Sequence, residues 1–257
     1  MQDAEIISYL TDGPAALPDG SEVCYIRARG ADFSHSVHSH CSFHFADLSR
    51  GDFRGAQFKN CNFLNADLTG ALMEEATFVD CEFTGCGLSQ IAASSAKFTR
   101  CVFIRSNLLG AYLEASAFVD CAFEACSISS LVTQTVAAGS VFDQVTFRSS
   151  SLESLDADCA HFLACKMDTV SMYGAILSGA NIYLSVLESV DLSAAYMDAS
   201  TIEDSLVAGN INGVDLSRAL VRNSDLSGAA GVAILDDDTE IIESVISPHF
   251  TLKEETK

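Results

Sequence analysis

A five-residue period runs through most of this chain and limits what it can fold into. Large apolar residues recur at almost every fifth position, in one phase from Phe33 to Ile128 and in a second phase from Phe142 to Val207. A third, shorter phase starts at Ile211, and each change of phase removes a single residue. Neither an α-helix, with a period of 3.6, nor a β-strand, with a period of 2, keeps such a phase. We therefore expect a coil that turns a corner every five residues.

A second period of twenty residues lies on top of the first. The triplet Cys-x-Phe begins at five positions that are twenty residues apart: Cys41, Cys61, Cys81, Cys101 and Cys121. Four corners close one coil of twenty residues, so residues twenty apart stack on one wall of a solenoid. Neighbouring coils lie about 4.8 Å apart, which suits offset stacking of like rings. The residue two before each large one also points inward, where Ala, Ser and Cys fit. The forty units predict about ten coils.

The five-residue units resemble the pentapeptide repeat family, whose motif is A-[D/N]-L-x-x. The closest stretches are ADLSR from Ala46, ADLTG from Ala66, ANIYL from Ala180, VDLSA from Val190 and SDLSG from Ser224. The resemblance covers about residues 31–230. It implies an all-β fold, a right-handed quadrilateral β-helix. The spacing of the residues independently supports a square solenoid, whereas the handedness comes from the resemblance alone.

The residues before the repeat are expected to form a cap, because an uncovered end would leave unpaired backbone groups. We place this N-terminal cap at residues 1–30. It offers a short helix (Asp3–Leu10), a turn rich in Pro and Gly (Thr11–Gly20) and a possible strand (Glu22–Arg27).

The residues after the repeat, 231–257, are expected to form a capping and dimerisation helix and a tail. Asp236–Asp238 stand where acids favour a helix N-terminus, and Ser247-Pro248 would end the helix. Its apolar stripe either covers the last coil only or also joins two subunits in a homodimer, and it consists of Ile241, Ile242, Val245 and Ile246.

The net charge of −21 is distributed unevenly. Residues 27–105 carry eight acids and eight bases, whereas residues 106–217 carry fourteen acids and two bases. Over about 27 Å of coils the second stretch has one net charge per about 2.2 Å, against about 1.7 Å for duplex DNA. Such a protein is not expected to bind nucleic acid or an anionic membrane directly. Its surface either imitates DNA or is acidic because Asp and Asn suit corner turns and favour solubility.

One branch of the pentapeptide repeat family makes the first alternative specific. The resemblance to its Qnr quinolone-resistance proteins, their mycobacterial relative, and the albicidin and microcin self-protection proteins implies action on DNA gyrase or topoisomerase IV. These proteins typically act as dimers joined at the C-terminal end, with an acidic surface resembling DNA. This sequence is longer and lacks the inserted loops of the Qnr group. The alternative function is a scaffold or a secreted effector that binds a partner without a DNA-binding groove.

One wall of the acidic half is the candidate partner-binding surface. It flanks the inward residues Ala157, Leu177, Met197 and Leu216. It combines acids with exposed apolar groups and has no base of its own. It consists of Asp156, Asp158, Ile176, Tyr196, Asp198 and Asp215.

No sequence motif for catalysis or cofactor binding is found, so we expect a protein that is not an enzyme and uses no cofactor. His35, His38, His40 and His44 beside Cys41 are suitable ligand types for zinc. The repeat register spreads them over different walls, so we do not expect a metal site. The ten cysteines are expected to be buried and reduced. No stretch is long and apolar enough to span a membrane and no basic leader is found, so a cytoplasmic location is expected.

Overall fold

The structure is a computed structural model that describes residues 17–131, 135–248 and 250–254. These residues form strands, isolated bridges and turns, without a helix. The fold is an all-β β-solenoid of right-handed type with about ten turns. The repeat predicts the solenoid, and the family resemblance predicts its hand. The chain divides into two compact units, residues 1–131 and 132–257, which we describe separately. The helix expected at Asp3–Leu10 lies outside the described residues.

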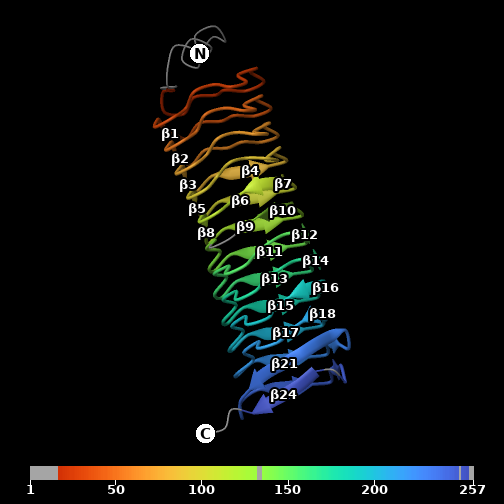
Figure 1. Cartoon of the computed structure of the whole chain (residues 1–257). Coiled ribbons are helices and arrows are strands. Elements are labelled where there is room, and N and C mark those ends of the chain that lie inside the picture. The colour runs from red at the N-terminus through yellow and green to blue at the C-terminus, as the bar shows by residue number, and fades with distance from the viewer. Residues whose placement is uncertain (1–16, 132–134, 249, 255–257) are drawn as a thin grey trace. The chain divides into compact units, whose positions relative to one another are not determined.

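The first unit is a stack of short parallel strands (Figure 1). One sheet has the order β1-β2-β3-β5-β8, a second has β4-β6-β9, and β7 pairs with β10. The strands are β1 (Val37–Ser39), β2 (Gln57–Lys59), β3 (Thr77–Val79), β4 (Glu82–Thr84), β5 (Lys97–Thr99), β6 (Val102–Ile104), β7 (Asn107–Tyr112), β8 (Ala117–Val119), β9 (Ala122–Glu124) and β10 (Ser127–Leu131).

The second unit is built in the same way. One sheet has the order β11-β13-β15-β17-β19-β22 and another has β12-β14-β16-β18-β20-β23, with β21 paired to β18 and β24. The strands are β11 (Val141–Asp143), β12 (Thr146–Arg148), β13 (His161–Leu163), β14 (Lys166–Asp168), β15 (Asn181–Tyr183), β16 (Val186–Asp191), β17 (Thr201–Glu203), β18 (Leu206–Asn210), β19 (Leu220–Arg222), β20 (Asp225–Leu226), β21 (Ala229–Leu235), β22 (Glu240–Ile242), β23 (Val245–Ile246) and β24 (Phe250–Glu254).

The register of these ladders explains the five-residue period. Phe58 lies opposite Phe78, and Phe142 lies opposite Phe162, so partners are twenty residues apart. Between successive strands the chain turns a corner, at which one residue takes a left-handed conformation, as Asn60 does with φ 52°. The left-handed region suits Gly, Asn and Asp best. Each five-residue repeat therefore supplies a short strand and one corner.

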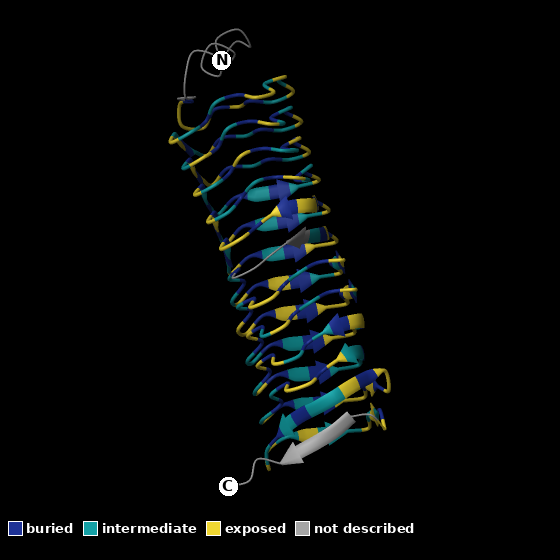
Figure 2. Ribbon diagram, in the orientation of Figure 1, coloured by how far each residue is buried: buried dark blue, intermediate teal, exposed yellow. Residues whose placement is uncertain are grey.

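The core consists of the large residue at the centre of each five-residue repeat. These residues are buried in both compact units (Figure 2). Phe43, Phe63, Phe83, Phe103 and Phe123 form one column, with ring centroids 4.6–4.9 Å apart and nearly parallel planes. A second column starts at His38 and continues with Phe58 and its equivalents on later coils, with centroids 4.7–5.2 Å apart. The predicted ring stacking is therefore confirmed.

The predicted C-terminal helix is wrong. The residues assigned to it form β22 and β23, which pair in parallel with β19 and β20. Its apolar stripe also fits the five-residue period, because Ile241 and Ile246 continue the columns of Val221 and Leu226. The free edges of β19 and β20 offer backbone hydrogen bonds that an isolated helix would leave unused.

The first coil also begins earlier than the expected cap boundary suggests. Glu22 bridges to Ser42 and Arg27 bridges to Asp47, with the same spacing of twenty residues. These are isolated bridges, so no continuous strand forms over Glu22–Arg27.

Candidate functional site

Four of the six predicted partner-binding residues are neighbours in one parallel ladder of the second unit. Asp156 pairs with Ile176, Ile176 with Tyr196, and Tyr196 with Asp215. The residue that follows each of them in the sequence is buried in the core, as Ala157 is. The ladder residues are only partly buried or exposed, so their side chains are available on the outer surface.

A second column runs beside this ladder, two residues further along each coil. By the register it consists of Asp158, Ser178, Asp198, Ser217 and Asp236. The hydroxyl of Ser178 donates a hydrogen bond to Asp198 on the next coil. The acids stand on every second coil, about 10 Å apart by the usual strand spacing. We call this column and the ladder Asp156–Ile176–Tyr196–Asp215 together the acidic wall.

Asp236 belongs to the acidic wall, although the sequence analysis assigned it to the start of a helix. Its carboxylate accepts hydrogen bonds from the backbone N–H of Arg218 at 2.8 Å and from the hydroxyl of Thr239 at 2.8 Å. The N–H of Arg218 and the other donors hold the pKa of Asp236 below its usual value. The signal in the sequence was the Leu-Asp pair at 235–236, which repeats the Leu-Ser pair at 216–217 one coil earlier.

Aspartate fits the acidic wall because its short side chain also closes the local turn. Oδ1 of Asp215 accepts a hydrogen bond from the N–H of Ser217 at 3.0 Å, and Oδ1 of Asp156 accepts one from the N–H of Asp158 at 3.3 Å. Asp and Asn make such bonds to the backbone two residues on. The turn therefore selects Asp or Asn, and only Asp adds charge.

The prediction that this wall has no base is wrong. The guanidinium of Arg218 forms an ion pair with Asp198 at 2.5 Å. Arg218 directly follows Ser217 of the acidic wall in the sequence, and its side chain reaches Asp198 on the preceding coil. Asp198 is thus largely neutralised, whereas Asp156, Asp158 and Asp215 have no ion-pair partner within the described part of the chain.

The second unit as a whole remains strongly acidic. Residues 132–257 contain nineteen acids and six bases. Besides Arg218, Arg222 is paired, with Glu203 at 3.7 Å. The first unit, residues 1–131, contains sixteen acids and eight bases, and the two balance only over residues 27–105. The larger part of the uncompensated charge therefore lies on the unit that carries the acidic wall.

Two exposed apolar side chains interrupt the acids of this wall. Ile176 is 40% exposed and Tyr196 is 55% exposed, on successive coils between Asp156 and Asp215. Single exposed apolar residues are common on protein surfaces. A tyrosine beside an aliphatic residue and carboxylates is, however, a frequent composition for protein interfaces.

The four residues predicted to join two subunits lie at the C-terminal end of the second unit. Val245 is 58% exposed, and Ile241 and Ile246 are half-buried. Val221 and Leu226, which correspond to Ile241 and Ile246 one coil earlier, are fully buried. The difference arises because no described strand of either ladder continues beyond β22 and β23. Ile242 is also half-buried on this terminal coil.

The histidines near the start of the chain do not converge on a metal site. His38 is buried in the core column, whereas His35 and His40 occupy exposed left-handed corners with φ 55°. His40 instead contacts Asp19 at 2.9 Å. Within the described ranges, no group of three or more His, Cys, Asp or Glu side chains is arranged to hold a metal ion.

The fold and the acidic wall define a parallel β-solenoid built from five-residue units with a negatively charged face. The chain belongs to the pentapeptide repeat family. The family model for pentapeptide repeats matches in eight copies, including residues 29–65, 52–90 and 61–100. None of the curated proteins matches this sequence, and no enzyme family is found.

Several solved structures are similar to this chain. Full-length QnrB1, described as a plasmid-mediated fluoroquinolone resistance protein, has 16% identity and a TM-score of 0.32, with 86% of this chain and 94% of that chain covered. HetL, described as involved in heterocyst differentiation regulation in the cyanobacterium Nostoc sp. strain PCC 7120, has 18% identity and a TM-score of 0.25, with 90% and 87% covered. A pentapeptide repeat protein of the Arabidopsis thaliana thylakoid lumen has 19% identity and a TM-score of 0.17, with 49% and 68% covered. These likenesses concern the fold alone.

Among the residues that the structure describes, no helix is long and apolar enough to cross a membrane.

Proposed function

We propose that the acidic wall is a docking surface that imitates duplex DNA and binds DNA gyrase or topoisomerase IV. Binding there would protect the enzyme from quinolone-type inhibitors or modulate their action. In this proposal the protein is not an enzyme, needs no cofactor, contacts neither nucleic acid nor membrane, and works in the cytoplasm. The proposal includes the quadrilateral cross-section that the family implies, so that one of four walls meets the partner.

The observation that carries the proposal is the charge along the second unit. Residues 135–246 contain seventeen acids and four bases. They make about five and a half coils, or about 27 Å, which gives one net charge per about 2 Å of axis, close to the value of about 1.7 Å for duplex DNA. A groove that accepts DNA through basic side chains would therefore meet a similar density of negative charge.

The test compares two double variants that change charge equally. Asp156→Asn with Asp215→Asn removes two charges from the acidic wall. Asp47→Asn with Asp67→Asn removes two from the first unit. All four aspartates accept the same turn hydrogen bond from the N–H two residues on, at 2.9–3.3 Å. Because Asn keeps that acceptor, both variants should fold.

We expect the first variant to lose about tenfold in affinity for gyrase or topoisomerase IV, at about 0.7 kcal/mol per exposed charge. The second variant should stay within about twofold, because its wall is not the docking surface. Binding of the wild type should also weaken as salt increases. Inhibition of supercoiling and relief of quinolone poisoning give the functional readout. A wild type without effect on either enzyme at tens of micromolar, or equal losses in both variants, would refute the proposal.

A second candidate function is a protein-interaction scaffold or secreted effector whose partner does not bind DNA. The exposure of Ile176 and Tyr196 favours it, because apolar side chains add nothing to an imitation of phosphate charge. Tyr196→Ala should then abolish binding to that partner with little salt dependence. Tyr173→Ala is the matched control, because Tyr173 is equally exposed, at 53%, but lies outside the acidic wall.

The proposal also includes a homodimer joined at the C-terminal end, where Ile241, Ile242, Val245 and Ile246 are incompletely covered. Val245→Glu should give monomers in sedimentation, because it places a charge on the exposed coil end without touching the core. Val141→Glu on β11 is the control, as Val141 is exposed within the stack. A wild type that sediments as a monomer at micromolar concentration would exclude the dimer.

A further inference from the structure

Five buried cysteines form a continuous ladder inside the first unit. Cys41, Cys61, Cys81, Cys101 and Cys121 occupy the same position on five successive coils and are at most 2% exposed. Two residues after each cysteine is a phenylalanine of the first core column, whose rings repeat at 4.6–4.9 Å. The coils, and therefore the cysteines, are spaced by the same distance. We call these five residues the cysteine ladder.

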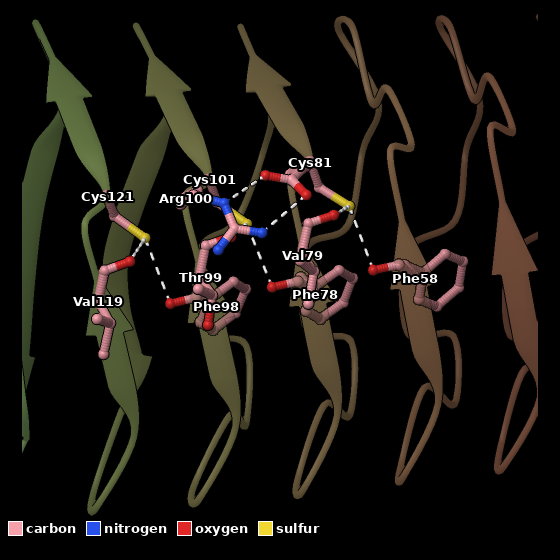
Figure 3. Close-up of polar contacts among 11 residues, drawn as sticks. Phe58, Phe78, Val79, Cys81, Phe98, Thr99, Arg100, Cys101, Val119 and Cys121 are labelled. Atoms are coloured by element: carbon pink, nitrogen blue, oxygen red, sulfur yellow. Dashed lines mark hydrogen bonds and ion pairs between the residues drawn. The ribbon is translucent and has the colours of Figure 1, made fainter.

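The thiols of the cysteine ladder are oriented alike. The thiols of Cys81, Cys101 and Cys121 donate to backbone carbonyls of the preceding coil at 3.4–3.5 Å (Figure 3). The ladder is therefore a row of neighbouring thiols in the core, each directed to the same backbone acceptor of the coil before it.

The spacing of the ladder does not suit disulfides. Disulfide-bonded cysteines have Cβ atoms about 3.8 Å apart on average. In-register neighbours in this ladder are held at the coil spacing of 4.6–4.9 Å instead. All ten cysteines are accordingly free in the structure.

The same spacing suits a metal ion in line between two sulfurs. Two thiolate–metal bonds of about 2.3 Å span about 4.6 Å. We propose that the cysteine ladder binds soft, two-coordinate d10 ions, namely Cu(I), Ag(I) or Hg(II), each held between the sulfurs of successive coils. Thiolates select soft ions. The described residues offer no site with three or more ligands, so ions that require a tetrahedral shell are not bound there.

The charge balance permits such ions in an apolar core. One divalent ion displaces two thiol protons and leaves a neutral S–M–S unit. Four monovalent ions between five thiolates leave one negative charge for the whole ladder, which limits the cost of burying charge. No electron is transferred. Because the ladder is closed in the folded coils, the ions enter while the first unit folds or transiently opens.

The test uses a background in which the two cysteines that are not buried, Cys24 and Cys159, are changed to Ser. Cys61→Ser with Cys101→Ser leaves no two neighbouring thiols in the ladder. Cys86→Ser with Cys126→Ser is the matched control, because Ser106 already separates these two cysteines by one coil each way. Ser106 donates to the carbonyl of Phe83 at 2.7 Å, which shows that serine fits such a position. Both variants keep the same number of thiols.

Each protein is refolded with Ag⁺, Hg²⁺ or Zn²⁺, freed of loose ions by gel filtration, and assayed for bound metal. The background and the control should retain about two Hg²⁺ per chain, since five coils provide two separate pairs, and more Ag⁺ than Hg²⁺. X-ray absorption should show two sulfur ligands at about 2.3 Å. The pair-breaking variant should lose this uptake, and Zn²⁺ should not be retained. Equal uptake by both variants, or a metal with a single sulfur ligand, would overturn the proposal.

Discussion

Phe83→Ala tests whether the stacked rings hold the first unit together. Phe83 is completely buried in the middle of its column. Its ring stacks on Phe63 at 4.9 Å and on Phe103 at 4.8 Å. It also meets Phe78 at 5.5 Å and Phe98 at 6.2 Å edge-on. The substitution therefore removes four ring contacts at once.

The expected loss of stability lies at the upper end of the range for such changes. Truncating a buried Phe to Ala costs about 3–5 kcal/mol, and ring pairs add about 0.5–1.5 kcal/mol each beyond the buried area. The cavity cannot close easily, because the coil of Phe83 is held on both sides: Glu82 pairs with Asn62 and with Val102. We expect a loss of about 5 kcal/mol.

Cys81→Ala is the matched change in the neighbouring inward column. It removes one sulfur and a weak hydrogen bond to the carbonyl of Phe58 at 3.5 Å. A loss of about 1 kcal/mol is expected. Urea unfolding followed by far-UV circular dichroism gives both values, and hydrogen exchange over residues 77–104 shows whether the loss is local. Equal and small losses of stability in the two variants would refute the conclusion that the stacked ring of Phe83 stabilises the first unit.

Three further predictions concern single residues. Burial lowers the pKa of His38 to about 4, so between pH 6.5 and pH 4 the unfolded chain binds a proton that the folded chain does not. The free energy of unfolding should therefore fall by up to about 3 kcal/mol as the pH is lowered through this range. His38→Phe should remove this part of the pH profile in parallel unfolding titrations. Gly209 has φ 143°, and an added Cβ would lie 2.0 Å from a backbone oxygen of the preceding coil. Gly209→Ala should therefore lower the free energy of unfolding in urea by about 3 kcal/mol. Gly213→Ala, whose Cβ would have room, should lower it by about 1 kcal/mol. Arg218→Gln should free the carboxylate of Asp198 and strengthen salt-dependent binding of a basic partner, and an unchanged affinity in a binding titration would place Asp198 outside the contact surface.

The columns of the core could be predicted from the sequence because one physical rule produces them. A period of five with Phe or Leu at the centre and Cys, Ala or Ser two residues earlier leaves one arrangement in which all of them are buried. The ladder Asp156–Ile176–Tyr196–Asp215 follows from the same register. The structure brings these four residues into one ladder, whereas their role as a docking surface stays a prediction.

The C-terminal strands could not be predicted because their sequence fits two structures. Ile241, Ile242, Val245 and Ile246 form a helical stripe, and Ile241 and Ile246 also satisfy the five-residue period. The free edge of the preceding coil decides between the two, and this edge is a tertiary feature. The ion pair of Arg218 with Asp198 was missed for a related reason: Arg218 occupies the corner after Ser217, and only the folded coils bring its side chain to Asp198.

The parallel register sets the step by which such a chain can change its length. Every core residue meets partners about twenty residues away, however many coils precede or follow. Duplicating twenty residues would thus lengthen the acidic wall by one coil and leave every other side chain facing as before. Duplicating five residues would keep the core pattern but move all later residues onto the adjacent wall. In this protein the single-residue loss before Ile211 is absorbed locally, where Gly209 allows the backbones to approach, so the surface of the second unit keeps its arrangement across that loss.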